Sequence, residues 1–260
     1  MEVDLTTTTG GLDHTNEILQ DIKTIIFDLD GTLRHNLPSR SQTFVGFLSQ
    51  FGIENDLEKR HCVVRWEHYY WAQSEELAQD WLTFQVLTIN EANDPFWTNY
   101  MFRNLRAYGC PPEQAHELAP EAALYMEENY QPEDWVPPEV PTTLQALKES
   151  GFQLGLLSNR REPIHEKLDD LGLHGYFKLA LFAGEVNSWK PDPQIFHDAL
   201  SQLDTTARQT AYVGDNYYAD IIGAQRAGVN PVLLDPEGVF PDADCPVIKS
   251  IEDLLVLIES

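Results

Sequence analysis

Two carboxylates stand two residues apart in the segment FDLDGT, at Asp28 and Asp30, where a short apolar run meets a Gly-Thr turn. A third acid, Asp215, directly follows another apolar run, TAYVG. Like charges crowded into one cleft raise each other's cost of ionisation, and a chain selected only to fold would rarely place them there. A hard divalent cation such as Mg²⁺ accepts carboxylate and carbonyl oxygens and relieves the repulsion. The three acids therefore indicate a metal-bearing cleft.

The elements that must position these acids are short, apolar, β-branched runs separated by helical stretches. The pattern predicts strands over Thr24–Asp30, Phe152–Asn159, Lys178–Gly184, Thr210–Asp215, Val229–Asp235 and Pro246–Ser250. Strands that alternate with helices of this length indicate an α/β fold with a doubly wound, mainly parallel, Rossmann-like sheet.

Ligands of such sheets collect beyond the carboxyl ends of the strands. Four of the predicted strands are followed there by acids, hydroxyls, amides or a lysine, and this convergence raises the site above chance. The residues concerned are Asp28, Asp30 and Thr32, then Ser158 and Asn159, then Lys190, and finally Asp215, Asn216 and Asp220.

One interval breaks the alternation. Between His35 and Trp135 the sequence shows no convincing strand, and helical segments are predicted over 41–52, 58–87, 95–109 and 112–130. We therefore expect an all-helical domain over 37–136 inserted into an α/β core of residues 22–36 and 137–260. Residues 1–21 are acidic and Thr-rich and lack the pattern of a signal peptide, so a flexible N-terminal tail is expected.

Composition limits the partners. The formal net charge of −25 and pI near 4.4 disfavour binding to nucleic acid or to anionic lipid, because both depend on Lys and Arg. No apolar run has the length of a membrane-spanning helix. The three cysteines are far apart and form no CxxC pair, which favours a reducing, cytoplasmic compartment.

The ordered set FDLDGT, LLSN, KPDPQIF and VGDNYYADIIGAQRAG resembles the four signature motifs of the haloacid dehalogenase-like (HAD) hydrolase superfamily. The helical insert lies where that superfamily carries its cap domain. The resemblance implies a Mg²⁺-dependent phosphatase acting on a small phosphorylated molecule. Asp28 would attack phosphorus to form an aspartyl-phosphate, and Asp30 would act as general acid and base. The metal ligands would be Asp28, the main-chain carbonyl of Asp30, and Asp215.

The resemblance also assigns the residues around the phosphoryl group. Ser158 would offer its hydroxyl, together with a helix N-terminus, to a phosphate oxygen, and Lys190 would neutralise charge on the nucleophile and phosphate. Asp220 would orient Lys190 or hold a metal-bound water. Thr32 and Asn159 are further candidates for substrate binding. Outer substrate contacts are expected from the segments that follow the first two motifs, at Arg34, His35, Asn36, Arg160 and Arg161.

Alternatives remain open at this stage. The carboxylate of Asp30 disfavours dehalogenation, because relatives that cleave carbon–halogen bonds need neither this acid nor a metal. Phosphosugar mutases share all four motifs, and a non-catalytic HAD-like binding protein would keep the fold for a partner. The sequence specifies neither the substrate nor the oligomeric state.

Overall fold

The computed structural model describes residues 21–84 and 95–259. Its centre is a sheet of six parallel strands in the order β5-β4-β1-β6-β7-β8. The strands are β1 (Thr24–Phe27), β4 (Gln153–Ser158), β5 (Leu179–Phe182), β6 (Thr210–Gly214), β7 (Asn230–Leu234) and β8 (Val247–Ile248). Each falls within or overlaps a predicted run, so the doubly wound α/β fold is confirmed.

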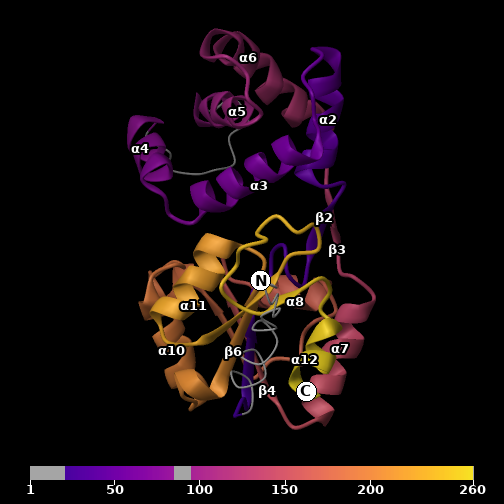
Figure 1. Ribbon diagram of the computed structural model, residues 1–260. Helices are drawn as coiled ribbons and strands as arrows, with labels where there is room; N and C mark the ends of the chain where they lie inside the picture. The colour runs from indigo at the N-terminus through magenta and orange to yellow at the C-terminus, as the bar shows by residue number, and fades with distance from the viewer. Residues whose placement is uncertain (1–20, 85–94, 260) are drawn as a thin grey trace, which may run out of the picture.

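Helices cover both faces of this sheet, which explains why its strands read as unbroken apolar runs. Successive residues of β1 point to opposite faces. Ile25 and Phe27 pack with α7 (Glu139–Glu149), α8 (His165–Asp170) and α12 (Asp253–Glu259), whereas Ile26 packs with α10 (Pro193–Leu203) and α11 (Ile222–Arg226). Figure 1 shows these two groups of helices on either side of the sheet. A short helix, α9 (Ala183–Val186), a 3₁₀ turn (Ala207–Gln209) and a π-helical turn, η2 (Tyr217–Ile221), complete this part.

A separate group of helices, the helical insert, lies beyond the carboxyl end of the sheet (Figure 1). It consists of α2 (Arg40–Gln50), α3 (Leu57–Trp71), α4 (Glu75–Phe84), α5 (Pro95–Ala107) and α6 (Pro112–Asn129). Its buried side chains form their own cluster, which is rich in aromatic rings. The domain boundaries proposed from the sequence stay a prediction, but the helical character of the interval and its separate core agree with them.

The prediction of no strand between His35 and Trp135 is wrong at the two ends of that interval. Strands β2 (His35–Leu37) and β3 (Glu133–Trp135) pair antiparallel, with Asn36 opposite Asp134. Both strands are three residues long and mostly polar. In the sequence they are separated by the whole insert. A local hydrophobic pattern carries no signal for such a ribbon. Both chain crossings between the sheet and the helical insert run through it.

The single helix predicted over 58–87 is also divided. Helix α3 ends at Trp71, and Gln73 adopts a left-handed conformation with φ of 57°. Ser74 then begins α4, because its Oγ accepts a hydrogen bond from the amide of Leu77 at 3.1 Å. The predicted residues 85–87 lie outside the described part of the chain.

Two other predictions concern the N-terminal tail and the absence of a membrane-spanning helix. The expected tail over 1–21 lies outside the described residues, apart from Asp21. Across residues 21–84 and 95–259, none of the helices combines the length and apolar character needed to cross a bilayer.

Candidate active site

The carboxyl edge of the sheet brings the sequence-predicted residues together, facing the helical insert. Asp28 follows β1, Ser158 ends β4 and Asp215 follows β6, and these three strands are neighbours in the sheet. The amide of Asp28 donates to the carbonyl of Val213 at 2.9 Å, so the ladder between β1 and β6 fixes the start of the acidic loop. Lys190 reaches the same edge from the segment after α9.

Lys190 is the centre of a buried polar network. Its Nζ donates to Oδ1 of Asp28 at 2.6 Å, to Oδ1 of Asp220 at 2.7 Å and to the hydroxyl of Tyr212 at 2.8 Å. Only 2% of the Lys190 side chain is exposed. Burial lowers the pKa of Lys190, but the charges of Asp220 and Asp28 outweigh burial and raise it overall. The lysine is therefore a fixed cation between two carboxylates.

Asp215 is held by a different partner. The hydroxyl of Thr32 donates to Oδ1 of Asp215 at 3.0 Å and accepts from the Asp215 amide at 3.1 Å. Gly31 has φ of +95°, and a Cβ atom there would lie 2.4 Å from the Asp215 carboxylate. A side chain at position 31 would therefore clash with Asp215, and glycine allows the carboxylate of Asp215 to lie close to the turn.

Three carboxylates form one cluster that fits a divalent cation. Oxygen atoms of Asp28, Asp215 and Asp220 all lie within 4.8 Å of one another. Burial raises the pKa of Asp28 to about 7, with Lys190 opposing the shift, and burial together with the charge of Asp28 raises the pKa of Asp215 well above its usual range. One lysine does not compensate three acids, of which Asp28 and Asp220 are buried and Asp215 is half-buried. Hard oxygen donors carrying surplus negative charge are the set that Mg²⁺ prefers.

The carboxylate of Asp30 points to two arginines instead of joining this cluster. Its Oδ2 accepts from Nε of Arg160 at 2.6 Å, and its Oδ1 accepts from Nη2 of Arg160 at 2.7 Å and Nη1 of Arg34 at 2.9 Å. Arg34 also donates to Oδ1 of Asn36 at 2.6 Å and pairs with Asp134. These contacts concern the side chain of Asp30 and leave the expected role of its carbonyl a prediction.

The two polar residues after β4 have different surroundings. Ser158 is 1% exposed, and its Oγ accepts from the Arg160 amide at 3.3 Å. Asn159 is joined to the main chain of Lys190, whose amide donates to Oδ1 at 2.7 Å while Nδ2 donates to the Lys190 carbonyl at 2.9 Å. Both polar groups of Asn159 are thus occupied, and Thr32 is occupied by Asp215. This geometry fits positioning roles for Asn159 and Thr32 better than the substrate contacts expected of them.

A cavity of about 240 Å³ opens beside these groups. Trp71, from the end of α3, also lines it, so the helical insert reaches the cavity beside the carboxylate cluster. The cavity has the size for a phosphate group and its nearest substituents. Its other lining residues are Asp28, Asp30, Ser158, Asn159, Arg160, Lys190, Asp215, Asn216, Ala219 and Asp220.

A second cavity of about 470 Å³ meets the first at Asp30 and Asp215, which line both. Its walls come from the ribbon, from α2 and α3, and from the loop after β7 that includes Phe240. His68 of α3 stacks on Phe240, with ring centroids 5.4 Å apart, and so joins the insert to the sheet on this side.

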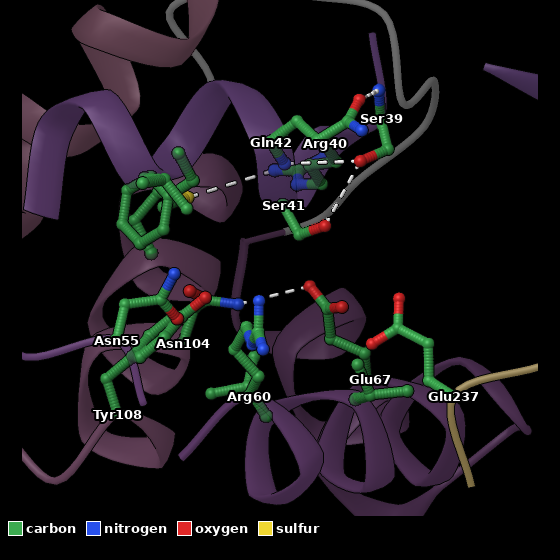
Figure 2. A pocket seen from close by; sticks show the side chains of 15 residues that line it. Ser39, Arg40, Ser41, Gln42, Asn55, Arg60, Glu67, Asn104, Tyr108 and Glu237 are labelled. Carbon is green, nitrogen blue, oxygen red and sulfur yellow. Dashed lines mark hydrogen bonds between the residues drawn. The ribbon is translucent and has the colours of Figure 1, made fainter. Parts of the chain in front are cut away.

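A third cavity, of about 210 Å³, lies further into the helical insert and shares Ser39, Arg40 and Glu67 with the second. Figure 2 shows its polar lining, in which Asn104 donates to Glu67 at 3.1 Å. The guanidinium of Arg40 lies 4.6 Å from the ring centre of Tyr100. Polar side chains therefore continue from the carboxylate cluster into the insert.

The residues expected to make outer substrate contacts do not all line the same cavity. His35 and Asn36 line the second cavity, whereas Arg161 stacks over Trp81 at 5.7 Å. Asn216 caps η2 by accepting from the amides of Tyr218 and Ala219. Sequence reasoning missed Tyr212 as a partner of Lys190. The signal was a tyrosine within a strand that is otherwise apolar, since a buried hydroxyl needs a hydrogen-bond partner.

Comparison with known proteins agrees with this geometry. The profile of the haloacid dehalogenase-like hydrolase family matches residues 22–228. The phosphoserine phosphatase of Thermus thermophilus is 30% identical over 233 residues, which cover 85% of this chain and 91% of that protein. The glyceraldehyde 3-phosphate phosphatase of Methanopyrus kandleri is 28% identical over 217 residues, covering 82% and 84%.

Among solved structures, a 2-haloacid dehalogenase from Pseudomonas syringae pv. Tomato DC3000 is similar, with a TM-score of 0.51 and 26% identity over 92% of this chain and 98% of that one. The chain belongs to the haloacid dehalogenase-like hydrolase family, so the predicted family membership is confirmed. The family includes both phosphatases and dehalogenases by name, and the choice between them depends on the site.

Proposed function

We propose that this hydrolase is a Mg²⁺-dependent phosphatase that cleaves a small phosphomonoester through an aspartyl-phosphate on Asp28. The observation that carries the proposal is the cluster of Asp28, Asp215 and Asp220 with its single lysine. A carboxylate that displaces halide from carbon has no need of two further acids beside it, whereas a metal that binds the phosphoryl group does need such ligands. The phosphatase relatives support the same choice.

Each residue has a role that its position allows. Oδ1 of Asp28 is engaged by Lys190, which leaves the other oxygen to attack phosphorus as the bond to the leaving alcohol breaks. The leaving oxygen takes a proton from Asp30, and Asp30 later takes a proton from the water that releases inorganic phosphate and restores Asp28. Ser158 and Lys190 hold phosphate oxygens.

The metal site would be formed by Asp28, the carbonyl of Asp30, and Asp215. Mg²⁺ bound there would neutralise the acids and the phosphate oxygens, so that two anionic groups can approach each other. Asp220, through its 2.7 Å contact with Lys190, would fix the lysine. The phosphoryl group would occupy the 240 Å³ cavity and the leaving group the 470 Å³ cavity, with Asp30 at their junction.

A phosphosugar mutase is the second candidate, because transfer of the phosphoryl group from Asp28 to a second hydroxyl uses the same residues. A non-catalytic binding protein is disfavoured because the network around Asp28 is complete. The partner is expected to be a small phosphorylated molecule, with no nucleic acid or membrane. The three cysteines are free, which supports a reducing, cytoplasmic setting.

The deciding experiment is hydrolysis of p-nitrophenyl phosphate by the wild-type protein and by Asp28→Asn, with Mg²⁺ and with EDTA. Activity that needs both Asp28 and Mg²⁺ is expected. Halide release from 2-chloropropionate without phosphate release would identify a dehalogenase instead. Conversion of a sugar 1-phosphate to its 6-phosphate would identify a mutase.

A further inference from the structure

The contacts of Asp30 lie at one end of a chain of alternating charges. Arg160 pairs with Asp30, Asp30 with Arg34, Arg34 with Asp134, and Asp134 with Lys167 of α8. This charge chain starts in the loop after β4, crosses the acidic loop and the strand β3, and ends on the sheet's own helical layer. It therefore joins the predicted acid/base residue to the ribbon that carries both chain crossings.

Within the charge chain, Arg34 contacts more segments of the protein than any other member. It donates to Asp30 from the acidic loop, to Asn36 on β2 and to Asp134 on β3. Asn36 and Asp134 are cross-strand partners, so one guanidinium contacts both strands of the ribbon at one register position. The main chain adds to this, because the Gly31 amide donates to the Arg34 carbonyl at 2.8 Å.

The two arginines on Asp30 differ in how firmly they are held. The side chain of Arg34 is 12% exposed, and its acceptors come from three segments. The side chain of Arg160 is 33% exposed and lines the 240 Å³ cavity. An incoming phosphoryl group would offer Arg160 new acceptors inside that cavity. Arg34 lines the 470 Å³ cavity instead, and would have to give up the ribbon to reach the phosphoryl group.

We propose that Arg34 is a positioning residue for proton transfer by Asp30. It holds Oδ1 of Asp30 against the ribbon, while Oδ2 takes up a proton from solvent once Arg160 turns to the phosphoryl group, and then gives that proton to the leaving group. The bond from phosphorus to the leaving oxygen breaks as that oxygen takes the proton, and Asp30 is left as a carboxylate. This inference rests on the proposed phosphatase function.

The test uses leaving groups that differ in their need for a proton. Phenolate leaves poorly without general-acid assistance and p-nitrophenolate leaves readily, and kcat/KM reports only the steps up to departure of the leaving group. We expect Arg34→Gln to lower kcat/KM for phenyl phosphate by about 10- to 100-fold and for p-nitrophenyl phosphate by less than about 3-fold. Asp30→Asn should show the same pattern with a larger loss.

A double-mutant cycle separates action through Asp30 from other effects. In the Asp30→Asn background, Arg34→Gln should cause no further loss on phenyl phosphate. Asp134→Asn, which removes the charge that pairs with Arg34 and leaves Asp30 unchanged, should give an intermediate loss with the same dependence on the leaving group. Arg208→Gln, which changes an exposed arginine at the opposite edge of the sheet, should change neither value.

Three results would overturn the proposal: equal losses on both esters, additive losses in the double variant, or an Arg34→Gln protein that is folded and fully active on phenyl phosphate. Thermal unfolding of each variant shows whether it is folded, and Asp134→Asn keeps the test decisive if Arg34→Gln is not. Failure of the underlying phosphatase function looks different, since Asp28→Asn would then match the wild type on both esters.

Discussion

Asn159 and Lys190 are joined by two hydrogen bonds between one side chain and one peptide segment, at 2.7 and 2.9 Å. The amide of Asn159 thereby sets the position from which the Lys190 side chain enters the carboxylate cluster. Asn159, which follows Ser158 in the chain, thus positions Lys190, although Lys190 belongs to a different motif.

Asn159→Ala should therefore lower kcat/KM for p-nitrophenyl phosphate by roughly 10- to 100-fold, because two partly buried hydrogen bonds worth about 1–3 kcal/mol are lost at the base of Lys190. Asn230→Ala is the matched control. Its Nδ2 also donates to main-chain carbonyls, including that of Thr210 at 2.9 Å, but at the amino end of β6. The control should lose stability and keep its kcat/KM. Equal kinetics of Asn159→Ala and wild type would show that Lys190 is positioned without Asn159.

Mg²⁺ should stabilise the folded protein, and Asp215 should be required for that effect. A ligand that binds only the folded state at about 100 times its Kd adds about 2.7 kcal/mol to the free energy of unfolding. Thermal unfolding with increasing Mg²⁺ should show a rising Tm for wild type and little change for Asp215→Asn. Asp170→Asn removes an exposed carboxylate from α8 and should respond like wild type. A full Mg²⁺ response in Asp215→Asn would place the metal elsewhere.

The stability of the contact between α3 and the sheet should depend on pH through His68. Burial lowers the pKa of His68 to about 4, against about 6.5 in the unfolded chain. The unfolded state therefore binds the extra proton between pH 6.5 and 4, and stability should fall as the pH falls through that window, by up to about 3 kcal/mol.

His68→Phe keeps a ring against Phe240 but cannot titrate. The difference in free energy of unfolding between this variant and wild type should thus change between pH 7 and pH 4.5 in urea titrations. His174→Asn, at an exposed histidine paired with Asp169, provides the control and should show a much smaller change. An NMR titration in which the His68 ring protonates near pH 6.5 would contradict the prediction.

The ion pair between the buried Asp80 and the half-buried Arg103 should set much of the stability of the helical insert. Asp80 of α4 is 3% exposed, accepts two hydrogen bonds from Arg103 at 2.8 Å each, and accepts a third from the hydroxyl of Tyr70 at 2.9 Å. Asp80→Ala leaves Arg103 and Tyr70 without this partner and should cost about 2–4 kcal/mol. Tyr70→Phe should cost about 1 kcal/mol. Urea unfolding measures both, and a loss below that of Tyr70→Phe in Asp80→Ala would show that the pair contributes little.

The sequence was sufficient for the sheet and for the acids at its edge. Strand β1 is an apolar run buried on both faces, and Asp28 ends it, so the period of the pattern and the direction of parallel strands place Asp28, Ser158 and Asp215 on one edge. The sequence could not predict which side chains from two distant loops form ion pairs. Arg160 lies 130 residues from Asp30 in the chain, and a local pattern says nothing about which acid an arginine will contact.

The same limit applies to Thr32 and Asn159, whose expected contacts with a substrate stay a prediction. Thr32 and Asn159 have the types that suit a phosphate, but each is consumed by a neighbour, Asp215 or the main chain of Lys190. The residue type determines which hydrogen bonds a side chain can form, and the fold determines which partner lies close enough to form them. The break between α3 and α4 is similar, because Ser74 is tolerated within a helix and becomes a cap only through the turn at Gln73.

The antiparallel ribbon makes the helical insert exchangeable. Leu37 and Glu133 face each other as the last aligned pair before the chain departs for α2 and returns from α6. Directly opposed residues of such a pair are separated by a gap that a two-residue hairpin turn closes. A tight Asn-Gly turn between them would leave the sheet and its carboxylates covalently continuous without the insert, and a different insert could be grafted at the same two positions. Under the proposed function, the insert that walls the 470 Å³ cavity and the sheet that carries the carboxylates can thus change independently of each other.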